Sequence, residues 1–295
     1  MVLSASTRDS FWQQVVEELP GTPLEVEVRR NDFYSEPEWD VYEARYNGLG
    51  GYRLFAWLSV PRGSGPFPGL VQMPDYGSAV DIPYTSLRHD VVVLNASYRG
   101  QRRSDTPFQA SYPGLLTQGL GNSTAYILRR VYADALRAVD FLLTQSSVDP
   151  QRIAVAGAGL GGTLAIVAGA FRPQVRALAV DTPIMLGAPN AQKLTRAYPL
   201  EEINDYFRAY PQREETVLAS LELFSPLALA AQVRCPTLLG VGARDMGQCP
   251  PPLGEEMAHQ LRHGELHQYP GGSEGGGHQH AVLRTQWLRE QLGLT

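Results

Sequence analysis

The sequence has 295 residues and a mass of 32.4 kDa, and 43% of its residues are hydrophobic while 19% are charged. This composition is sufficient for a full hydrophobic core and excludes a disordered chain, so one large domain or two small ones are expected. With 25 basic and 30 acidic residues the net charge is -5. Such a chain offers no basic surface for nucleic acid or for an anionic membrane.

Only two cysteines are present, Cys235 and Cys249, too few for a disulfide framework or a cysteine-built zinc site. Cys249 is expected to be a small buried residue rather than a nucleophile. The first residues lack a basic stretch followed by an apolar run, and no stretch of about 18 apolar residues occurs. These features predict a cytoplasmic protein that does not interact with membranes.

Strand and helix patterns alternate along most of the chain. Residues 41–60 form two strand-like runs around an Asn-Gly and a Gly-Gly turn, which predicts a hairpin. Short apolar runs predict buried strands at 68–73, 90–96, 152–157, 175–181 and 235–242. Helices are predicted at 126–143, 161–171 and 278–292. The alternation predicts an α/β fold, with a mostly parallel central sheet flanked by helices.

No repeat, low-complexity segment or linker interrupts this order, so residues 1–295 are predicted to form a single domain. Residues 1–60 make an N-terminal extension that includes the hairpin. The stretch 182–232 departs from the alternation, because two helical pieces, at 201–210 and 215–224, lie between two predicted sheet strands. A helical insertion of this kind often covers a site, so we expect a lid-like segment.

A glycine-rich turn follows one of the predicted buried strands and has three interpretations. Gly157, Gly159 and Gly162, with Asp181 about twenty residues further on, match the spacing of a dinucleotide-binding fingerprint. Gly157, Gly159 and Gly161 match a Gly-x-Ser-x-Gly nucleophile elbow, with glycine in place of the serine. The third interpretation is a tight strand-to-helix turn without chemistry. The segment alone does not decide among them.

Motifs in the rest of the chain discriminate between these interpretations. They include Tyr-Arg-Gly-Gln at 98–101, VGARDMGQCPP at 241–251 and YPGGSEGGG at 269–277, with longer similar stretches at 129–141, 148–157 and 198–236. The set closely resembles the acetyl xylan esterase and cephalosporin C deacetylase family of carbohydrate esterases, from about residue 10 to the C-terminus. The resemblance implies an α/β-hydrolase fold whose serine, aspartate and histidine remove acetyl groups from small sugars and from cephalosporin C. It also implies a ring-like homo-oligomer, and no cofactor is predicted.

Three positions correspond to the catalytic triad of that family. Gly159 stands at the position of the nucleophilic serine and has no side chain that could form an acyl-enzyme. Ser273 stands at the histidine position, immediately before Glu-Gly-Gly-Gly, and serine is not a base near neutral pH. Asp245 matches the triad aspartate, although the run from Asp245 to Cys249 is one residue longer than in the family.

Two further positions correspond to the oxyanion hole and the substrate-binding loop. Tyr76 matches the tyrosine of the family, but the His-Gly that precedes it in the family is Pro74-Asp75 here. Leu160 replaces a glutamine directly after the nucleophile position, where the backbone N–H completes the oxyanion hole. The resemblance implies that the binding geometry persists in part without the reactive groups.

Histidines near the C-terminus are the candidates for a rearranged esterase site. His278 and His280 follow Ser273 by five and seven residues, and a slipped loop could bring either imidazole to Asp245. We favour a solvated helix start for both.

The sequence does not favour a metal site. His259 and His263 lie one helical turn apart, but they lack the carboxylate of the metalloprotease pattern. His278 and His280 have no closed set of ligands around them.

The leading hypothesis is a family member whose serine hydrolase mechanism is impaired or lost, a pseudoenzyme with a residual pocket for an acetylated sugar or a small anion. The anion prediction depends on free N–H groups at the helix start beside Gly159. An active acetyl esterase using Asp245 with His278 or His280, and a dinucleotide-binding module, are the alternatives. Because the triad is incomplete, the sequence leaves open whether the protein is an enzyme.

Overall fold

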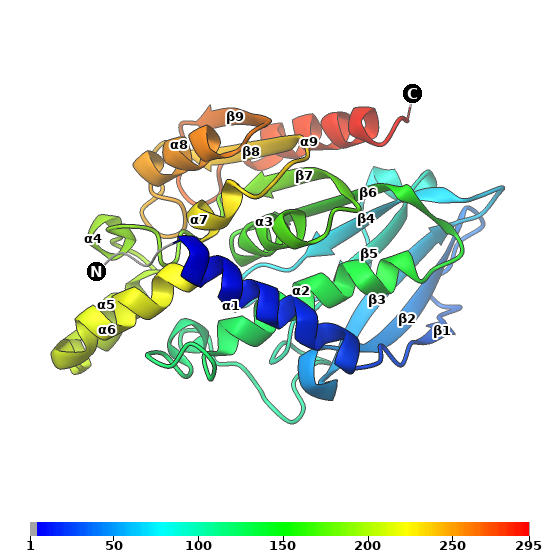
Figure 1. The fold of residues 1–295 in the computed structure, drawn as a ribbon. Coiled ribbons are helices and arrows are strands. Elements are labelled where there is room, and N and C mark those ends of the chain that lie inside the picture. The colour runs from blue at the N-terminus through cyan, green and yellow to red at the C-terminus, as the bar shows by residue number, and fades with distance from the viewer. Residues whose placement is uncertain (1–4, 295) are drawn as a thin grey trace.

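The computed structural model describes residues 5–294, and nine strands within this range form one sheet. The strands are β1 Glu27–Arg30, β2 Trp39–Asn47, β3 Arg53–Pro61, β4 Phe67–Met73, β5 Val92–Ala96, β6 Val148–Ala158, β7 Val175–Asp181, β8 Thr237–Gly242 and β9 Gly264–Tyr269. Their order in the sheet is β1-β2-β3-β5-β4-β6-β7-β8-β9 (Figure 1). β1, β2, β3 and β5 pair antiparallel, and the pairing is parallel from β5 through β4 to β9.

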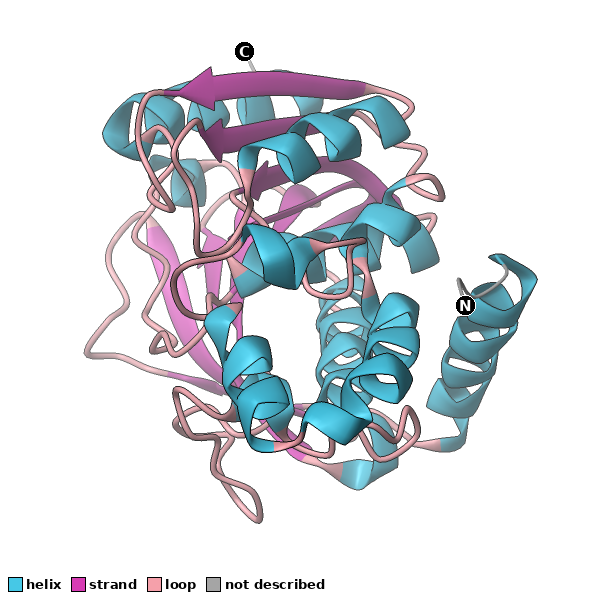
Figure 2. Cartoon of the chain, turned by 90° about the vertical axis from the view of Figure 1, so that its left-hand side faces the viewer, coloured by secondary structure: helices cyan, strands magenta, loops and turns pink. Residues whose placement is uncertain are grey.

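Helices cover both faces of this sheet, as Figure 2 shows. They are α1 Ala5–Glu18, α2 Ile127–Leu143, α3 Leu160–Phe171, α4 Ala191–Leu194, α5 Glu201–Ala209, α6 Glu214–Leu221, α7 Pro226–Ala230, α8 Pro251–Gln260 and α9 Gly277–Gln291. On one face α2 and α3 pack against β4 and β6, and α1 packs on α2. On the opposite face α9 packs against β7 and β8. The predicted α/β class with a mostly parallel, helix-flanked sheet is therefore confirmed.

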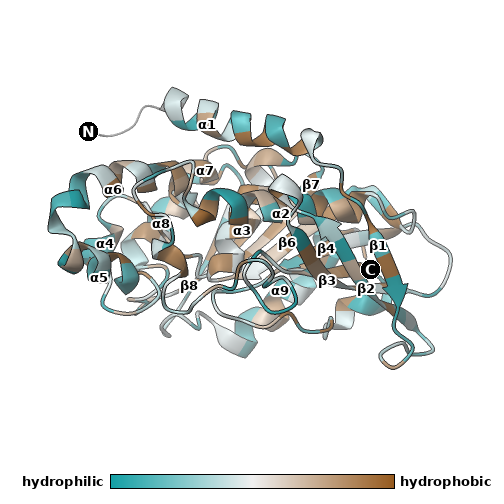
Figure 3. Ribbon diagram, turned by 90° about the horizontal axis from the view of Figure 1, so that it is seen from below, coloured by the Kyte–Doolittle hydropathy of each residue, from teal (hydrophilic) through white to brown (hydrophobic). Residues whose placement is uncertain are grey.

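Alternate residues of the central strands face the two helical layers. Ile153 and Val155 of β6 belong to the larger core, which includes α2 and α3. Ala154 and Ala156 belong to the smaller core with Trp287 of α9. Because both faces of β6 are covered, the strand is apolar along its buried length instead of alternating with polar residues. The hydropathy colouring of Figure 3 shows brown central strands and a mostly white and teal outer helix α1.

Every strand and helix range predicted from the sequence is present, with ends shifted by a few residues. The sequence patterns do not predict α1, β1, α8 or β9, nor the short helices α4 and α7 of the insertion. β1 is exposed along its whole length, and in β9 only Tyr269 is fully buried, so neither strand has the apolar alternation of a sheet strand. In α1 the apolar face is narrow, with Trp12 and Val15 as its buried residues in the helix.

The parallel strands present their carboxyl ends at one edge of the sheet. Loops that follow β4, β6, β8 and β9 at this edge carry Asp75, Gly159, Asp245 and Ser273, respectively. Ligands of α/β sheets bind at such an edge. The 182–232 insertion contains α4 to α7 between β7 and β8. Among residues 5–294, no helix is long and apolar enough to span a membrane.

Candidate active site

A one-residue turn joins β6 to α3. The strand ends at Ala158, the helix begins at Leu160, and Gly159 between them has φ 55° and ψ -121°. Side chains rarely tolerate a positive φ with this ψ, so the chain reverses here in a strained conformation that favours glycine. A sharp turn from a buried strand into a helix, at the carboxyl edge of the sheet, is the geometry of a nucleophile elbow.

The neighbouring glycines are required by backbone crowding. A Cβ atom added to Gly157 would lie closer than 3.0 Å to the backbone of Gly161, and one added to Gly161 would lie equally close to the Met73 carbonyl. The glycine spacing is therefore explained by packing without a bound nucleotide. Asp181, the acidic residue of the dinucleotide interpretation, has Oδ1 2.6 Å from His280 Nε2 and accepts a hydrogen bond from Arg284 at Oδ2. The dinucleotide alternative has no support in this arrangement.

The Asp75 carboxylate occupies the space beside Gly159. Its Oδ1 accepts hydrogen bonds from the backbone N–H of Leu160 (2.9 Å) and from its neighbour Tyr76 (2.6 Å). A Cβ atom added to Gly159 would lie closer than 3.0 Å to this oxygen. The backbone N–H groups of Tyr76 and Leu160, the two residues that the resemblance places at the oxyanion hole, thus converge on one oxygen of the protein itself.

This finding corrects the prediction of a small-anion site at the elbow. That prediction required a free N–H at the start of α3, but the N–H of Leu160 already donates to Asp75. An external anion at this place would also face the Asp75 carboxylate, whose negative charge repels it.

Burial and hydrogen bonds act in opposite directions on the Asp75 carboxyl. Burial raises its pKa to about 6, and hydrogen bonds from the Leu160 N–H and the Gln248 side chain lower the pKa in part. Gln248 Oε1 in turn accepts a hydrogen bond from Thr182 Oγ1 at 3.1 Å. A chain of polar groups therefore runs from the end of β7 to the elbow.

Asp245 and Ser273 form a direct pair. Ser273 Oγ donates to Asp245 Oδ1 at 2.7 Å, so the two residues that the resemblance assigns to the histidine and aspartate positions are in contact. The backbone N–H groups of Gly247 and Gln248 donate to the same oxygen, and that of Cys249 donates to Oδ2. Asp245 is completely buried. Its carboxylate therefore organises the lengthened run to Cys249, and its side-chain partner is a hydroxyl instead of an imidazole.

Neither C-terminal histidine is paired with Asp245. His280 is buried, its Nδ1 lies 2.9 Å from the Tyr269 hydroxyl, and its Nε2 lies beside Asp181. His278 is exposed on α9. The structure thus contradicts the alternative prediction of a rearranged triad of Asp245 with His278 or His280. The carboxylate oxygens of Asp245 already accept hydrogen bonds from Ser273 and from three backbone N–H groups. The prediction that the residue is solvated at the start of the helix is confirmed for His278 and wrong for His280.

Tyr76 connects the elbow to the helical insertion. Its hydroxyl donates to Glu202 of α5, and the other oxygen of Glu202 accepts the N–H of Leu116 at 3.1 Å. Burial raises the pKa of Glu202 to about 7. The Tyr76 ring also packs edge-on against Tyr112. The insertion, the Asp75 loop and the segment before α2 therefore meet at Glu202.

Sequence reasoning singled out Asp75 only as a departure from the family pattern, and it did not identify Gln248, Thr182 or Glu202. The signals that pointed toward them were the replacement of His-Gly by Pro74-Asp75 and the extra residue between Asp245 and Cys249. Within residues 5–294, no cluster of three or more His, Cys, Asp or Glu side chains could hold a metal ion. His259 and His263 are both exposed.

A mostly parallel sheet with a nucleophile elbow after β6 and an acid after β8 defines an α/β-hydrolase. The sequence model of the acetyl xylan esterase (AXE1) family matches residues 5–290, and this chain belongs to that family.

Individual relatives agree with this assignment. The acetyl esterase Axe7A of Xylanibacter ruminicola is 22% identical over 266 residues, which cover 82% of this chain and 57% of that protein. The chain thus spans a little over half the length of this curated relative. The structure of an acetyl xylan esterase from Paenibacillus sp. R4 gives a TM-score of 0.87 at 26% identity, with 98% of this chain and 96% of that chain covered. Acetyl xylan esterase 1 from Thermoanaerobacterium sp. JW/SL YS485 shares the fold, with a TM-score of 0.84 at 22% identity over 96% and 93% of the two chains.

Proposed function

We propose that this family member binds a small sugar without hydrolysing an ester. The observation that carries the proposal is the position of Asp75, whose Oδ1 accepts the N–H groups of both Leu160 and Tyr76. In an active esterase such donors stabilise the acyl oxygen as it becomes negatively charged. A carboxylate in that place repels this oxygen, and Gly159 supplies no nucleophile that would generate it.

The remaining groups do not replace the lost chemistry. Ser273 contacts Asp245 but is no base near neutral pH. Serine hydrolases that lose their triad keep about 10³- to 10⁴-fold catalysis over water, which comes from the oxyanion hole and from substrate binding. Because Asp75 fills the hole here, we expect that residual contribution to be lost as well.

The names of the relatives, which are acetyl and acetyl xylan esterases, indicate acetylated sugars as the ligand chemistry. An ionised carboxylate such as Asp75 only accepts hydrogen bonds, as does the carbonyl of an acetyl group, whereas sugar hydroxyls donate them. We therefore propose that the site prefers free sugar hydroxyls to acetyl groups.

Turnover of p-nitrophenyl acetate by the purified protein tests the absence of hydrolysis, and the expected rate is that of buffer. A turnover of about 1 s⁻¹ or more is typical of enzymes. Such a turnover would refute the proposal if the Asp245→Ala variant lost this activity while circular dichroism showed that the variant remains folded.

Calorimetric titration with xylobiose and with its peracetylated form tests the ligand preference. We expect xylobiose to bind more tightly than its peracetylated form, and Asp75→Ala to weaken xylobiose binding at least tenfold. The matched variant Asp81→Ala, which removes an exposed carboxylate six residues away, should leave binding unchanged. Equal or tighter binding of the peracetylated sugar would contradict the preference.

A further inference from the structure

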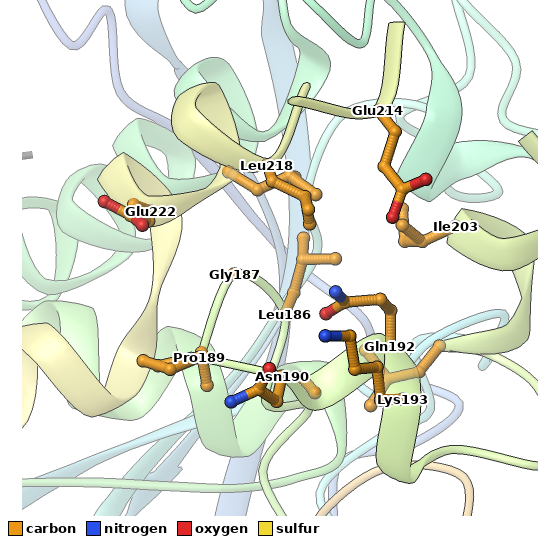
Figure 4. Close-up of a pocket in the computed structure, with 14 residues that line it drawn as sticks. Leu186, Gly187, Pro189, Asn190, Gln192, Lys193, Ile203, Glu214, Leu218 and Glu222 are labelled. Atoms are coloured by element: carbon orange, nitrogen blue, oxygen red, sulfur yellow. The ribbon is translucent and has the colours of Figure 1, made fainter. Parts of the chain in front are cut away.

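A cavity of about 250 Å³ lies within the helical insertion, apart from the elbow (Figure 4). Its walls come from the segment after β7, from α4, from α5 and from α6. Neither Asp75 nor Gly159 lines it. The proposed sugar site and this cavity are therefore separate features of the molecule.

The buried residues of the cavity lining are apolar, and Asn190, Gln192, Lys193, Glu214 and Glu222 also line the cavity. Four of its lining residues, each 2% exposed, are aliphatic: Leu186, Leu200, Ile203 and Leu221. Gly187 forms part of the wall with φ 71°, and a Cβ atom added there would lie closer than 3.0 Å to the Leu221 carbonyl. Sugar hydroxyls placed against these four aliphatic side chains would have no hydrogen-bond partners. The interior suits a small aliphatic group.

The mouth of the cavity carries both signs of charge. Lys193, Glu214 and Gln192 line the cavity and also a shallower depression next to it, which places them at the boundary between the two. Figure 4 shows the Lys193 and Gln192 side chains side by side and the Glu214 carboxylate across from them. Within residues 5–294, the structure gives neither the Lys193 ammonium nor the Glu214 carboxylate an ion-pair partner. An ammonium and a carboxylate are thus both available at one opening.

We infer that this cavity is a binding site for a free amino acid with an aliphatic side chain. The side chain would enter the apolar interior, the carboxylate would meet Lys193, and the ammonium would meet Glu214. Ligands with one charge would satisfy only one of the two mouth residues, and a zwitterion satisfies both. The volume is slightly below the range of about 300–1,000 Å³ that drug-sized ligands occupy, which agrees with a molecule as small as leucine. This inference does not depend on the sugar-binding proposal.

Calorimetric titration of the full chain with L-leucine tests the site. We expect saturable binding, and at least tenfold weaker binding of leucinamide, which lacks the carboxylate, and of 4-methylpentanoate, which lacks the amine. Glycine, which lacks the aliphatic group, should not bind at the same concentration. Equal binding of any of these three analogues would overturn the assignment, as would the absence of heat with leucine, isoleucine, valine and methionine at millimolar concentration.

Single substitutions at the mouth locate the binding. Lys193→Gln and Glu214→Gln should each weaken leucine binding at least tenfold, and Glu215→Gln, at an exposed neighbour outside the cavity lining, should not change it. All three positions are exposed, so folding should be retained, which circular dichroism verifies. Leucine binding that survives both mouth substitutions would place the ligand elsewhere and refute the inference.

Lys193 is the only lysine in the sequence, which allows a second measurement. An amine-reactive label should modify Lys193 more slowly in the presence of leucine than in a matched reaction with the same concentration of glycine, as measured by peptide mass spectrometry. The glycine sample consumes the same amount of reagent. An equal rate of Lys193 labelling in the two samples would contradict contact between Lys193 and the ligand.

Discussion

The Asp75 carboxylate occupies the space that a side chain at position 159 would need, because the Asp75 Oδ1 atom lies where that side chain would begin. The same oxygen accepts the N–H of Leu160, the first residue of α3. The absence of a side chain at position 159 and the position of the Asp75 carboxylate are therefore structurally linked. Residues in such close contact are expected to respond to substitution together.

The first prediction concerns this contact. Gly159→Ser should destabilise the protein by about 1–3 kcal/mol, because the added atoms overlap the Asp75 carboxylate in a packed site. Asp75→Gly introduced together with Gly159→Ser should recover the part of that loss that the overlap causes, while the backbone strain at φ 55° remains. Urea unfolding of the two single variants and the double variant measures the coupling. Additive effects of the two substitutions would show that the side chains do not compete for the same space.

The second prediction concerns restoration of activity. Gly159→Ser with Ser273→His restores two triad side chains, but we expect ester hydrolysis to stay at the background rate while Asp75 is present. Adding Asp75→Gly should free the N–H groups of Leu160 and Tyr76. Hydrolysis of p-nitrophenyl acetate should then rise by about 10²-fold or more, because one hydrogen-bond donor of an oxyanion hole contributes about that factor to the rate. Activity that is already high with Asp75 intact would mean that its carboxylate leaves the hole during turnover.

The third prediction is a pH dependence of stability. Burial raises the pKa of Asp75 from 3.8 to about 6, so the folded state holds this proton more tightly than the unfolded state. The Asp75 contribution to stability is therefore most favourable below pH 4 and is lost as the pH rises toward 6. Asp75→Asn removes this pH-dependent loss. The change in the free energy of unfolding caused by Asp75→Asn should therefore be more favourable at pH 8 than at low pH, by up to about 3 kcal/mol.

Urea unfolding at pH 4 and at pH 8 measures this difference. The pKa of Glu202 is raised to about 7, so Glu202 contributes a similar fall in stability at somewhat higher pH. Glu202→Gln therefore serves as the second variant, which measures the Glu202 contribution separately. An Asp75→Asn effect that is the same at both pH values would show that the folded protein does not raise the pKa of Asp75.

The fold was predictable because its strands are buried on both faces and its helices have regular apolar spacing. The elements that escaped prediction, such as β1 and β9, are exposed edge strands with little apolar signal. At the site, the sequence predicted the strand-to-helix turn at Gly159, which the structure contains, and it assigned Gly159 and Asp245 to positions of a triad, which stays a prediction. It could not identify the occupant of the hole, because the position of the Asp75 carboxylate depends on contacts between two loops more than 80 residues apart.

The burial of His280, which was predicted to be solvated, also depends on a contact distant in sequence. From the sequence, His280 lies in the first turn of a terminal helix, which is normally solvated. In the structure α9 lies flat on the sheet, and Gly240 of β8 leaves room for the imidazole, since a Cβ atom there would lie closer than 3.0 Å to the ring. A pairwise contact of this kind has no signal in local periodicity.

The fourth prediction separates the structural roles of Asp245 and Ser273. Ser273→Ala removes one hydrogen bond to a carboxylate that retains three N–H donors, so it should cost about 1 kcal/mol. Asp245→Ala leaves three backbone N–H groups without their acceptor in a buried place and should cost about 3–5 kcal/mol. Urea unfolding measures both values. Equal costs for the two variants would show that the N–H groups find other partners.

The fifth prediction tests whether His280 is a structural residue. His280→Ala should destabilise the protein by about 2–4 kcal/mol, because it opens a buried space and removes the contacts of the imidazole with Tyr269 and Asp181. His278→Ala, at an exposed position two residues earlier in α9, is the matched control and should change stability by less than about 0.5 kcal/mol. Any trace of ester hydrolysis should be the same in both folded variants. A selective loss of hydrolysis in His280→Ala would instead assign the imidazole a part in catalysis.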